Sequence, residues 1–199
     1  KNIVGAFWQP SLVIIDPDTL DTLSARELSN GLAEAAKTGL IRDPELFGLF
    51  ERDDWQDHLD EIIYRSIMVK KAIVEEDENE TSVRKLLNFG HTYGHAYESL
   101  AAGAYLHGEC VALGMMTIMK DQELKSRLAE VLKKLGLPCD PAAFLEGIMP
   151  MENAPTDAVM GIIMNDKKAA GGSIDIAVDT GEIHIGNNGP DVKTVTAKD

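Results

Sequence analysis

The chain has 199 residues, and its 19 basic and 33 acidic side chains give a formal net charge of −14, which argues against a general surface for nucleic acids or anionic membranes. Hydrophobic residues make up 44% and charged residues 26%, which is typical of a globular protein, and no apolar run approaches the roughly 20 residues of a membrane span. Two cysteines are too few for a disulfide framework, so we expect a reducing, cytoplasmic setting. Because the chain begins with Lys1 and shows no targeting segment, we expect it to start in the middle of a longer protein.

In chain order, the first predicted element is a strand at residues 12–15 with no partner strand nearby, an apolar run that Asp16-Pro17 ends. Helices follow, because Ser24 and Glu27 have the spacing of a capping box, and apolar residues then recur at helical intervals. On such signals we place helices at about 24–41, at 44–52, from Asp53-Asp54 to the acidic run at 75–80, at 82–101, 107–120 and 121–135, and from Asp140-Pro141 and Pro155-Thr156 onward.

The tail of the chain has the pattern of a β-hairpin. Apolar and polar residues alternate over 173–178 and 182–185, on either side of Asp179-Thr180-Gly181. The sequence shows no internal repeat and no low-complexity linker. We therefore predict a single, mainly α domain over residues 1–199 with a few short strands.

Three of the five histidines are placed so that they can converge. His91 and His95 are four residues apart, so on a helix their rings leave the same face, and Glu98 lies on that face too. His107 follows a turn at Gly103, and two antiparallel helices would bring its ring to the same place. Imidazoles grouped in this way can share a metal ion or a substrate.

Other motifs have simpler explanations from spacing alone. Glu34 and Lys37 have the spacing of a helical ion pair, and Glu80 belongs to an acidic run that is typical of a solvated loop. Glu80 also directly precedes the histidine-bearing segment, so it can reach the same site. Cys110, on an apolar stretch, is expected to be a small buried residue rather than a nucleophile. Three basic pairs are either solvated or bind a phosphate or carboxylate: Lys70-Lys71, Arg84-Lys85 and Lys167-Lys168.

Taken together, these motifs resemble the C-terminal half of the 3-dehydroquinate synthase family. The matching segments are Lys1 to Phe7, Asp18 to Leu23, Leu32-Ala33-Glu34-x-x-Lys37, Asp77 to Glu80, Arg84 to His91, His95, Leu106-His107-Gly108-Glu109 and Asp166-Lys167-Lys168. The resemblance is close over residues 1–120 and patchy beyond them. It implies the multihelical C-terminal domain of that fold, without the N-terminal dinucleotide-binding domain.

The resemblance also implies an activity. Members of the family are lyases that convert 3-deoxy-D-arabino-heptulosonate 7-phosphate, a small anionic sugar phosphate, into 3-dehydroquinate and phosphate in the shikimate pathway. They use NAD and a divalent metal ion, for which we expect zinc, with cobalt as the other choice. We expect the full-length protein to be a homodimer, and this half to be inactive alone.

Roles for individual residues follow from the same resemblance. The metal ligands are expected to be Glu34, His91 and His107, which differs from the pairing of His91 with His95 that spacing first suggested. The expected proton-transfer groups are Glu80 and His95. The expected substrate-binding residues are Asn2, Lys37, Lys70, Arg84, Asn88 and Lys168. The residues expected to contact NAD are Lys1, Thr19, Leu20, Asp21, Thr22 and Asn30.

Two other functions remain compatible with the sequence. One is the metal domain of an iron-type alcohol or glycerol dehydrogenase, which also has spaced histidines around a metal ion. The basic residues Lys37, Lys70 and Arg84 favour a phosphorylated anionic substrate over a simple alcohol. The other is a helical binding module without catalytic activity.

Overall fold

A computed structural model describes residues 4, 5, 8, 10–149, 155–169, 174–178 and 191–195, with the backbone alone beyond residue 165. The elements in this part of the chain are η1 (Pro17–Thr22), α1 (Ala25–Arg42), α2 (Pro44–Glu51), η2 (Trp55–His58), α3 (Leu59–Glu76), η3 (Val83–Asn88), α4 (His91–Ala101), α5 (His107–Ile118), α6 (Gln122–Lys134), α7 (Pro141–Ile148), α8 (Pro155–Ala169), β1 (Ile174–Val178) and β2 (Asp191–Val195). The predicted mainly α fold with a few short strands is confirmed.

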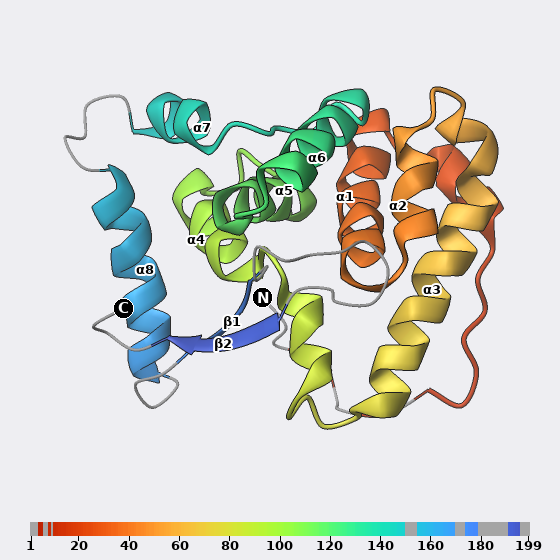
Figure 1. The fold of residues 1–199 in the computed structure, drawn as a ribbon, viewed down its shortest axis with the longest axis horizontal. Helices are drawn as coiled ribbons and strands as arrows, with labels where there is room; N and C mark the ends of the chain where they lie inside the picture. The colour runs from red at the N-terminus through yellow and green to blue at the C-terminus, as the bar shows by residue number, and fades with distance from the viewer. Residues whose placement is uncertain are drawn as a thin grey trace.

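Helix α5 lies at the centre of the structure and packs against α1, α4, α6 and α7. Figure 1 shows α1, α2 and α3 at one end, α4 and α5 in the middle and α8 at the other end. One apolar core lies among α1, α2, α3, α5 and α6, and a second joins α4 and α5 to α7 and α8. Because α5 contributes to both cores, most of its side chains are buried.

Local signals fix several helix ends where the sequence predicts them. Ser24 and Glu27 form the predicted capping box of α1, and Asp43 caps α2 by accepting from the Leu46 amide. Gly136 follows α6 with φ of 70°, a conformation that glycine adopts without strain. These caps satisfy terminal backbone groups that the helix itself leaves unpaired.

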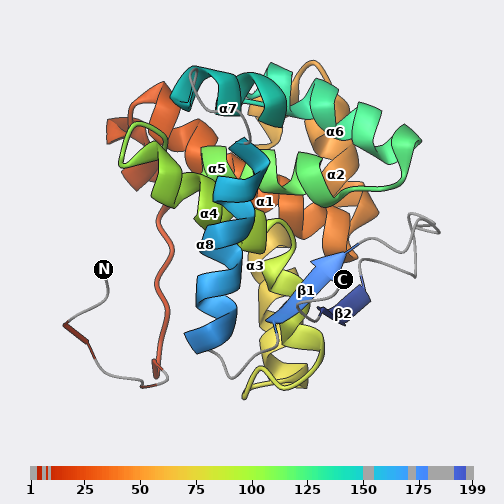
Figure 2. The same ribbon diagram turned by 90° about the vertical axis from the view of Figure 1, so that its left-hand side faces the viewer.

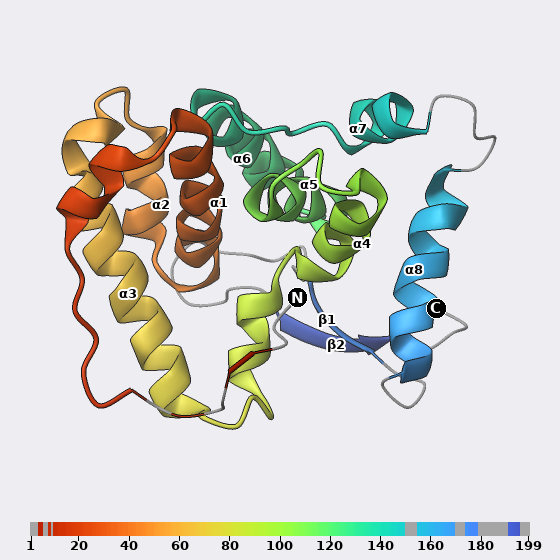
Figure 3. The ribbon, with the colours of Figure 1, turned by 180° about the vertical axis from the view of Figure 1, so that it is seen from behind.

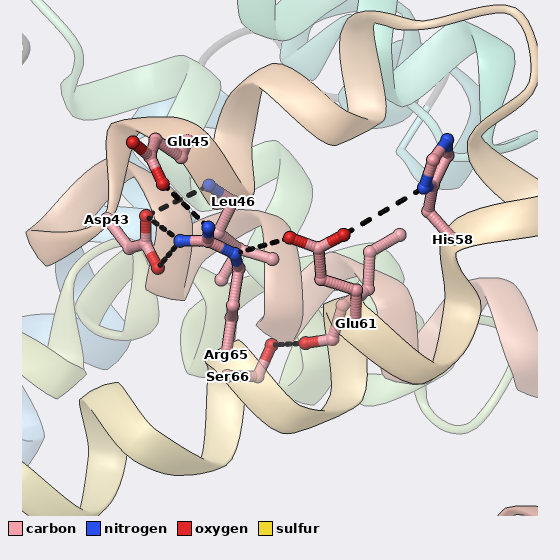
Figure 4. A network of polar contacts seen from close by, with 8 residues as sticks. Asp43, Glu45, Leu46, His58, Glu61, Arg65 and Ser66 are labelled. Carbon is pink, nitrogen blue, oxygen red and sulfur yellow. Dashed lines mark hydrogen bonds and ion pairs between the residues drawn. The ribbon is translucent and has the colours of Figure 1, made fainter.

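Arg65 on α3 ties that helix to the beginning of α2 (Figure 4). Its guanidinium group donates to the Asp43, Glu45 and Glu61 carboxylates, at distances from 2.6 to 3.2 Å. The side-chain hydrogen bonds with Glu61, Asp43 and Glu45 raise the pKa of Arg65. Since Asp43 is also the cap of α2, one arginine fixes the angle between the two helices.

The strand predicted at residues 12–15 is wrong. This segment is extended but pairs with no strand in the described part of the chain, and Leu12 and Ile14 are 76% and 83% exposed. Figures 2 and 3 show the segment before η1 running clear of the helices. A strand needs a hydrogen-bonded partner, and none lies beside this segment among the residues that the structure describes.

Two further predictions need correction. The helix predicted at 82–101 is divided into η3 and α4, because Gly90 has φ of 78° and breaks the helical path. In the predicted hairpin, β1 pairs antiparallel with residues 191–195, and residues 182–185 lie outside the described residues. Among the helices that the structure describes, none is both long and apolar enough to cross a membrane.

Candidate functional site

Three helices bring one carboxylate and two imidazoles together. Glu34 lies in the middle of α1, while His91 and His107 are the first residues of α4 and α5. The Glu34 Oε1 atom lies 3.3 Å from His91 Nε2 and 3.6 Å from His107 Nε2. Each residue can therefore offer one ligand atom to a single ion, since all three atoms lie within 4.8 Å of one another.

Hydrogen bonds on the far side of each ring set the direction of its lone pair. His91 Nδ1 lies 3.2 Å from the Phe89 carbonyl oxygen, and His107 Nδ1 lies 3.0 Å from Glu98 Oε2. A carbonyl oxygen and a carboxylate can only accept, so both Nδ1 atoms carry the proton. In the neutral rings, the Nε2 lone pairs then point toward Glu34.

The buried Oε1 atom of Glu34 has no hydrogen-bond partner among the described residues. It faces two acceptor nitrogens, an arrangement that a positive charge between the three atoms would satisfy. One carboxylate and two imidazoles leave coordination positions free, as in catalytic zinc sites. The donor set therefore fits a divalent metal ion that also binds a substrate.

The electrostatics of the site favour positive charge. Burial would raise the pKa of Glu34, but His107, His91 and Lys37 together hold it well below its ordinary value. The neighbouring Glu34 carboxylate raises the pKa of His107, which burial opposes, and Glu98 raises it further. Both shifts stabilise an ionised carboxylate beside a cation.

Lys37 and Lys70 extend the site along α1 and α3. The buried Lys37 ammonium group donates to Glu34 Oε2, so only Oε1 of this carboxylate is left without a hydrogen-bond partner among the described residues. Burial lowers the pKa of Lys37 against the opposing charge of Glu34, and the nearby charge of Lys70 lowers it further. Of the predicted substrate-binding lysines, Lys37 therefore contacts the Glu34 carboxylate, and Lys70 lines the same cavity as Glu34.

His95 lies beside both candidate imidazole ligands. Its ring centroid is 5.4 Å from that of His91 and 5.6 Å from that of His107. The three histidines that the sequence groups together therefore converge. His95 is exposed, so a substrate can reach its ring.

A loop anchored on Asp77 carries three more of the predicted residues. The Asp77 carboxylate, 6% exposed, accepts from the backbone amides of Thr81, Ser82 and Arg84. Burial would raise the pKa of Asp77, but these amides hold it well below its ordinary value. Within the anchored loop, Glu80 has φ of 58° and its Oε1 accepts from Asn88 Nδ2 at 2.8 Å, while Arg84 Nη1 donates to the Glu78 carbonyl.

Glycines allow α4 and α5 to approach closely enough to join their histidines. A Cβ atom on Gly114 would lie 2.0 Å from the Gly90 carbonyl oxygen, and one on Gly94 would lie 3.1 Å from the Val111 Cα. A Cβ on Gly108 would similarly meet the Asn30 carbonyl oxygen at 2.0 Å. The site therefore depends on glycine at the contact points between helices.

Asn30 contacts α5, a contact that the sequence does not reveal. Its Oδ1 accepts from the Gly108 amide at 2.5 Å, and nearby Arg26 donates two hydrogen bonds to the Glu109 carboxylate. Asn30 lies one helical turn before Glu34, so it fixes the start of α5 relative to the carboxylate. The sequence did contain a signal for the start of α5. Glu109 lies three residues after Leu106, the spacing of a helix cap, and its carboxylate accepts from the Leu106 amide.

The structure describes only some of the remaining residues that were expected to contact NAD or the substrate. Thr19, Leu20, Asp21 and Thr22 form most of η1, and Leu20 lines a cavity of about 330 Å³ that reaches Glu34 and Lys70. Lys1 and Asn2 lie outside the described residues, and for Lys168 the structure describes only the backbone in α8. Asn2 and Lys168 were expected to bind the substrate and Lys1 to contact NAD, and these roles, like those of the other site residues, remain predictions.

Comparison with known proteins matches the chain to two domain models of one family. The model of the 3-dehydroquinate synthase C-terminal domain matches residues 31–169, and that of the N-terminal domain matches residues 1–30. The chain belongs to the 3-dehydroquinate synthase family. The family resemblance predicted from the motifs is confirmed.

This chain matches about half the length of curated members of the family. The 3-dehydroquinate synthase of Streptococcus thermophilus is 44% identical over 188 residues, which cover 87% of this chain and 50% of that protein. The enzyme of Geobacter metallireducens is 38% identical over 204 residues, covering 95% of this chain and 52% of that protein. The chain thus spans about half the length of these relatives.

Two solved structures share the fold. A 2-epi-5-epi-valiolone synthase from Streptomyces hygroscopicus subsp. jinggangensis 5008, with NAD⁺ and Zn²⁺ bound, has a TM-score of 0.72 at 25% identity and covers 100% of this chain and 54% of its own. A 2-deoxy-scyllo-inosose synthase complexed with carbaglucose-6-phosphate, NAD⁺ and Co²⁺ has a TM-score of 0.69 at 22% identity, covering 100% of this chain and 57% of its own. The second comparison concerns the fold alone.

Proposed function

We propose that this chain is the metal- and substrate-binding half of a 3-dehydroquinate synthase that works in the cytoplasm as a homodimer when full length. The reaction converts 3-deoxy-D-arabino-heptulosonate 7-phosphate into 3-dehydroquinate and phosphate, with NAD and a divalent ion, zinc or cobalt. The observation that carries the proposal is the buried Oε1 of Glu34, which faces the Nε2 atoms of two histidines without a hydrogen-bond partner among the described residues. NAD⁺ together with Zn²⁺ in the 2-epi-5-epi-valiolone synthase structure, which is 25% identical, supports it.

In the proposed reaction, Glu34, His91 and His107 hold the metal ion. When bound, the ion would supply Lewis acidity to a substrate hydroxyl, and NAD would supply the capacity for reversible hydride transfer. His95, next to both imidazole ligands, moves a proton to or from the substrate. Glu80, hydrogen-bonded to Asn88, is the second proton-transfer group.

Basic residues near the carboxylate suit an anionic substrate. Lys37 and Lys70 approach the site from α1 and α3, and Arg84 is held by the loop anchored on Asp77. With Asn88, these groups bind the phosphate, the carboxylate and the hydroxyls of the sugar acid. A simple alcohol, as in an iron-type dehydrogenase, would not need this positive charge in an otherwise acidic chain.

The proposal is tested by metal binding and by phosphate release. The purified chain is expected to bind one Zn²⁺ or Co²⁺ ion, and Glu34→Gln is expected to reduce that affinity by at least tenfold because one charged ligand is lost. Mixed with the N-terminal half of the Streptococcus thermophilus enzyme and NAD, the chain is expected to release phosphate from the sugar phosphate. Each half alone is the control.

Two results would contradict the proposal. If the purified chain binds no divalent ion, the assignment of the metal site is wrong. If NAD is reduced by a simple alcohol in the mixture and no phosphate is released, the site belongs to a dehydrogenase instead.

A further inference from the structure

Glu98 contacts a metal-site histidine but has no role in the proposed reaction. It lies on α4, two helical turns after His91, and its Oε2 atom is 3.0 Å from His107 Nδ1. The Glu98 side chain is 28% exposed and the His107 side chain 34%, so the contact is partly shielded from water. It links α4 to the first residue of α5.

The contact is on the edge of the His107 ring opposite the metal site. His107 Nε2 faces Glu34, whereas Nδ1 faces Glu98. A carboxylate that accepts from Nδ1 keeps the proton there, leaves the Nε2 lone pair free and fixes the rotation of the ring. It also makes the imidazole a stronger donor to a metal ion.

We propose that Glu98 is a positioning residue that presents His107 Nε2 to the metal ion, an inference that rests on the proposed metal site. Its effect is on metal affinity, through the tautomer and orientation of His107. Glu98 itself does not bind the ion held by Glu34, because the imidazole ring of His107 lies between them.

The two imidazole ligands are oriented by different kinds of group. His91 is held by the backbone carbonyl of Phe89, which no substitution removes. His107 is held by a side chain, and only its backbone is fixed separately, through the Asn30 contact with the Gly108 amide. The orientation of His107 can therefore be changed by substitution while its helix stays in place.

The same residues permit another arrangement. His95, Glu98 and His107 can also offer ligand atoms that lie within 4.8 Å of one another, which would suit a second ion. Such an ion would have to displace the proton that His107 Nδ1 donates to Glu98. Because that hydrogen bond already has ordinary length, the structure favours the positioning role.

The test is the Zn²⁺ affinity of the purified 199-residue chain, measured by competition with a chromophoric chelator, together with the Co²⁺ absorption spectrum. Glu98→Ala is expected to weaken Zn²⁺ binding about 10–100-fold at an unchanged stoichiometry of one ion, as for other residues that orient metal-bound histidines. Glu98→Gln, which keeps the shape and a neutral acceptor, is expected to lose less, and Glu98→Asp less still. A shifted Co²⁺ band in Glu98→Gln would report the altered imidazole donor.

Controls separate this inference from the proposed function. Glu130→Gln removes a carboxylate from an exposed ion pair with Lys133 and is expected to leave Zn²⁺ affinity unchanged. Thermal midpoints of the metal-free variants show whether a loss of affinity comes from unfolding. If the unaltered chain binds no ion, the proposed metal site fails and the inference fails with it. Two results would overturn the inference alone. In one, the unaltered chain binds one ion and the Glu98 variants bind it equally well. In the other, the unaltered chain binds two ions and Glu98→Gln binds one.

Discussion

At the scale of single residues, the two carboxylate oxygens of Glu34 have different surroundings. Its Oε2 accepts from Lys37, and its Oε1 has no hydrogen-bond partner among the described residues and faces the proposed metal position. The lysine compensates part of the charge, so the carboxylate stays ionised in a partly buried position. A ligand that is ionised before the metal arrives needs no proton to be displaced from it.

Substitution of His95 is expected to impair proton transfer and to leave metal binding intact. Substitution of His95 by alanine should leave Zn²⁺ affinity within about twofold, because the ring lies beside the ligands and is not needed as one in the proposed site. Phosphate release by the reconstituted enzyme should fall about 10²–10⁴-fold, the usual contribution of a positioned acid or base. Zn²⁺ affinity and phosphate release are measured on the same preparations.

The His95→Ala experiment also decides between the two pairings of histidines. Loss of the metal in this variant would show that His91 and His95 bind it together, as their spacing alone first suggested. His58→Ala is the matched control, because His58 lies at the start of α3 and takes part in neither proposed role.

At the scale of elements, helix positions are largely determined by local sequence, but contacts between helices are not. Caps such as Ser24 and Asp43 act within a few residues, so their patterns predict where α1 and α2 begin. The contacts of Asn30 with Gly108 and of Glu98 with His107 join different helices, and no local pattern contains the distance between those helices. The three proposed metal ligands were predicted through motifs of the family, since spacing alone favoured another pair, and the structure brings their ligand atoms within 4.8 Å of one another.

The close contact of α4 and α5 predicts a clear stability difference between two glycine substitutions. Gly114→Ala is expected to destabilise the chain by about 3 kcal/mol, because its Cβ would lie 2.0 Å from the Gly90 carbonyl oxygen. Gly48→Ala, where a Cβ meets nothing within 4 Å, is expected to stabilise α2 by roughly 0.5–1 kcal/mol. Urea denaturation of both variants measures the difference, and equal midpoints would contradict the close packing of α4 on α5.

The loop anchored on Asp77 predicts a pH dependence. The pKa of Asp77 is held below its unfolded value of about 3.9, so its stabilising effect is present above that pH. The effect is lost as the pH falls through the lower pKa of the folded state. Protection of the Thr81, Ser82 and Arg84 amides against hydrogen exchange should therefore decrease at low pH.

Substitution tests whether Asp77 is the group responsible. In Asp77→Asn, one acceptor oxygen is replaced by an NH₂ group that faces backbone donors, so the three amides should lose protection already at neutral pH. The amides of α6, capped separately by Asp121, serve as an internal reference. Unchanged protection in the loop of this variant would show that other contacts hold it.

At the scale of the whole molecule, the segment predicted as a strand at residues 12–15 stands out because it pairs with no strand in the described part of the chain. Leu12, Val13, Ile14 and Ile15 are exposed, although their composition is that of a buried strand. They belong to residues 1–30, which match the N-terminal domain of the family. We therefore expect this apolar segment to pair with a strand of the N-terminal domain in a full-length member of the family.

Ile14→Lys tests this interpretation of the exposed segment. Ile14 is 83% exposed, so the substitution should leave the thermal midpoint of the 199-residue chain unchanged. A charge in a strand that is buried between the two halves should, however, weaken their association by at least tenfold. Binding of the labelled N-terminal half, measured by fluorescence anisotropy, reports the association, and Glu75→Lys on the exposed side of α3 controls for the added positive charge. Equal affinity of the Ile14→Lys and unaltered chains for the N-terminal half would place the contact between the halves elsewhere, because a lysine cannot enter an apolar sheet without cost.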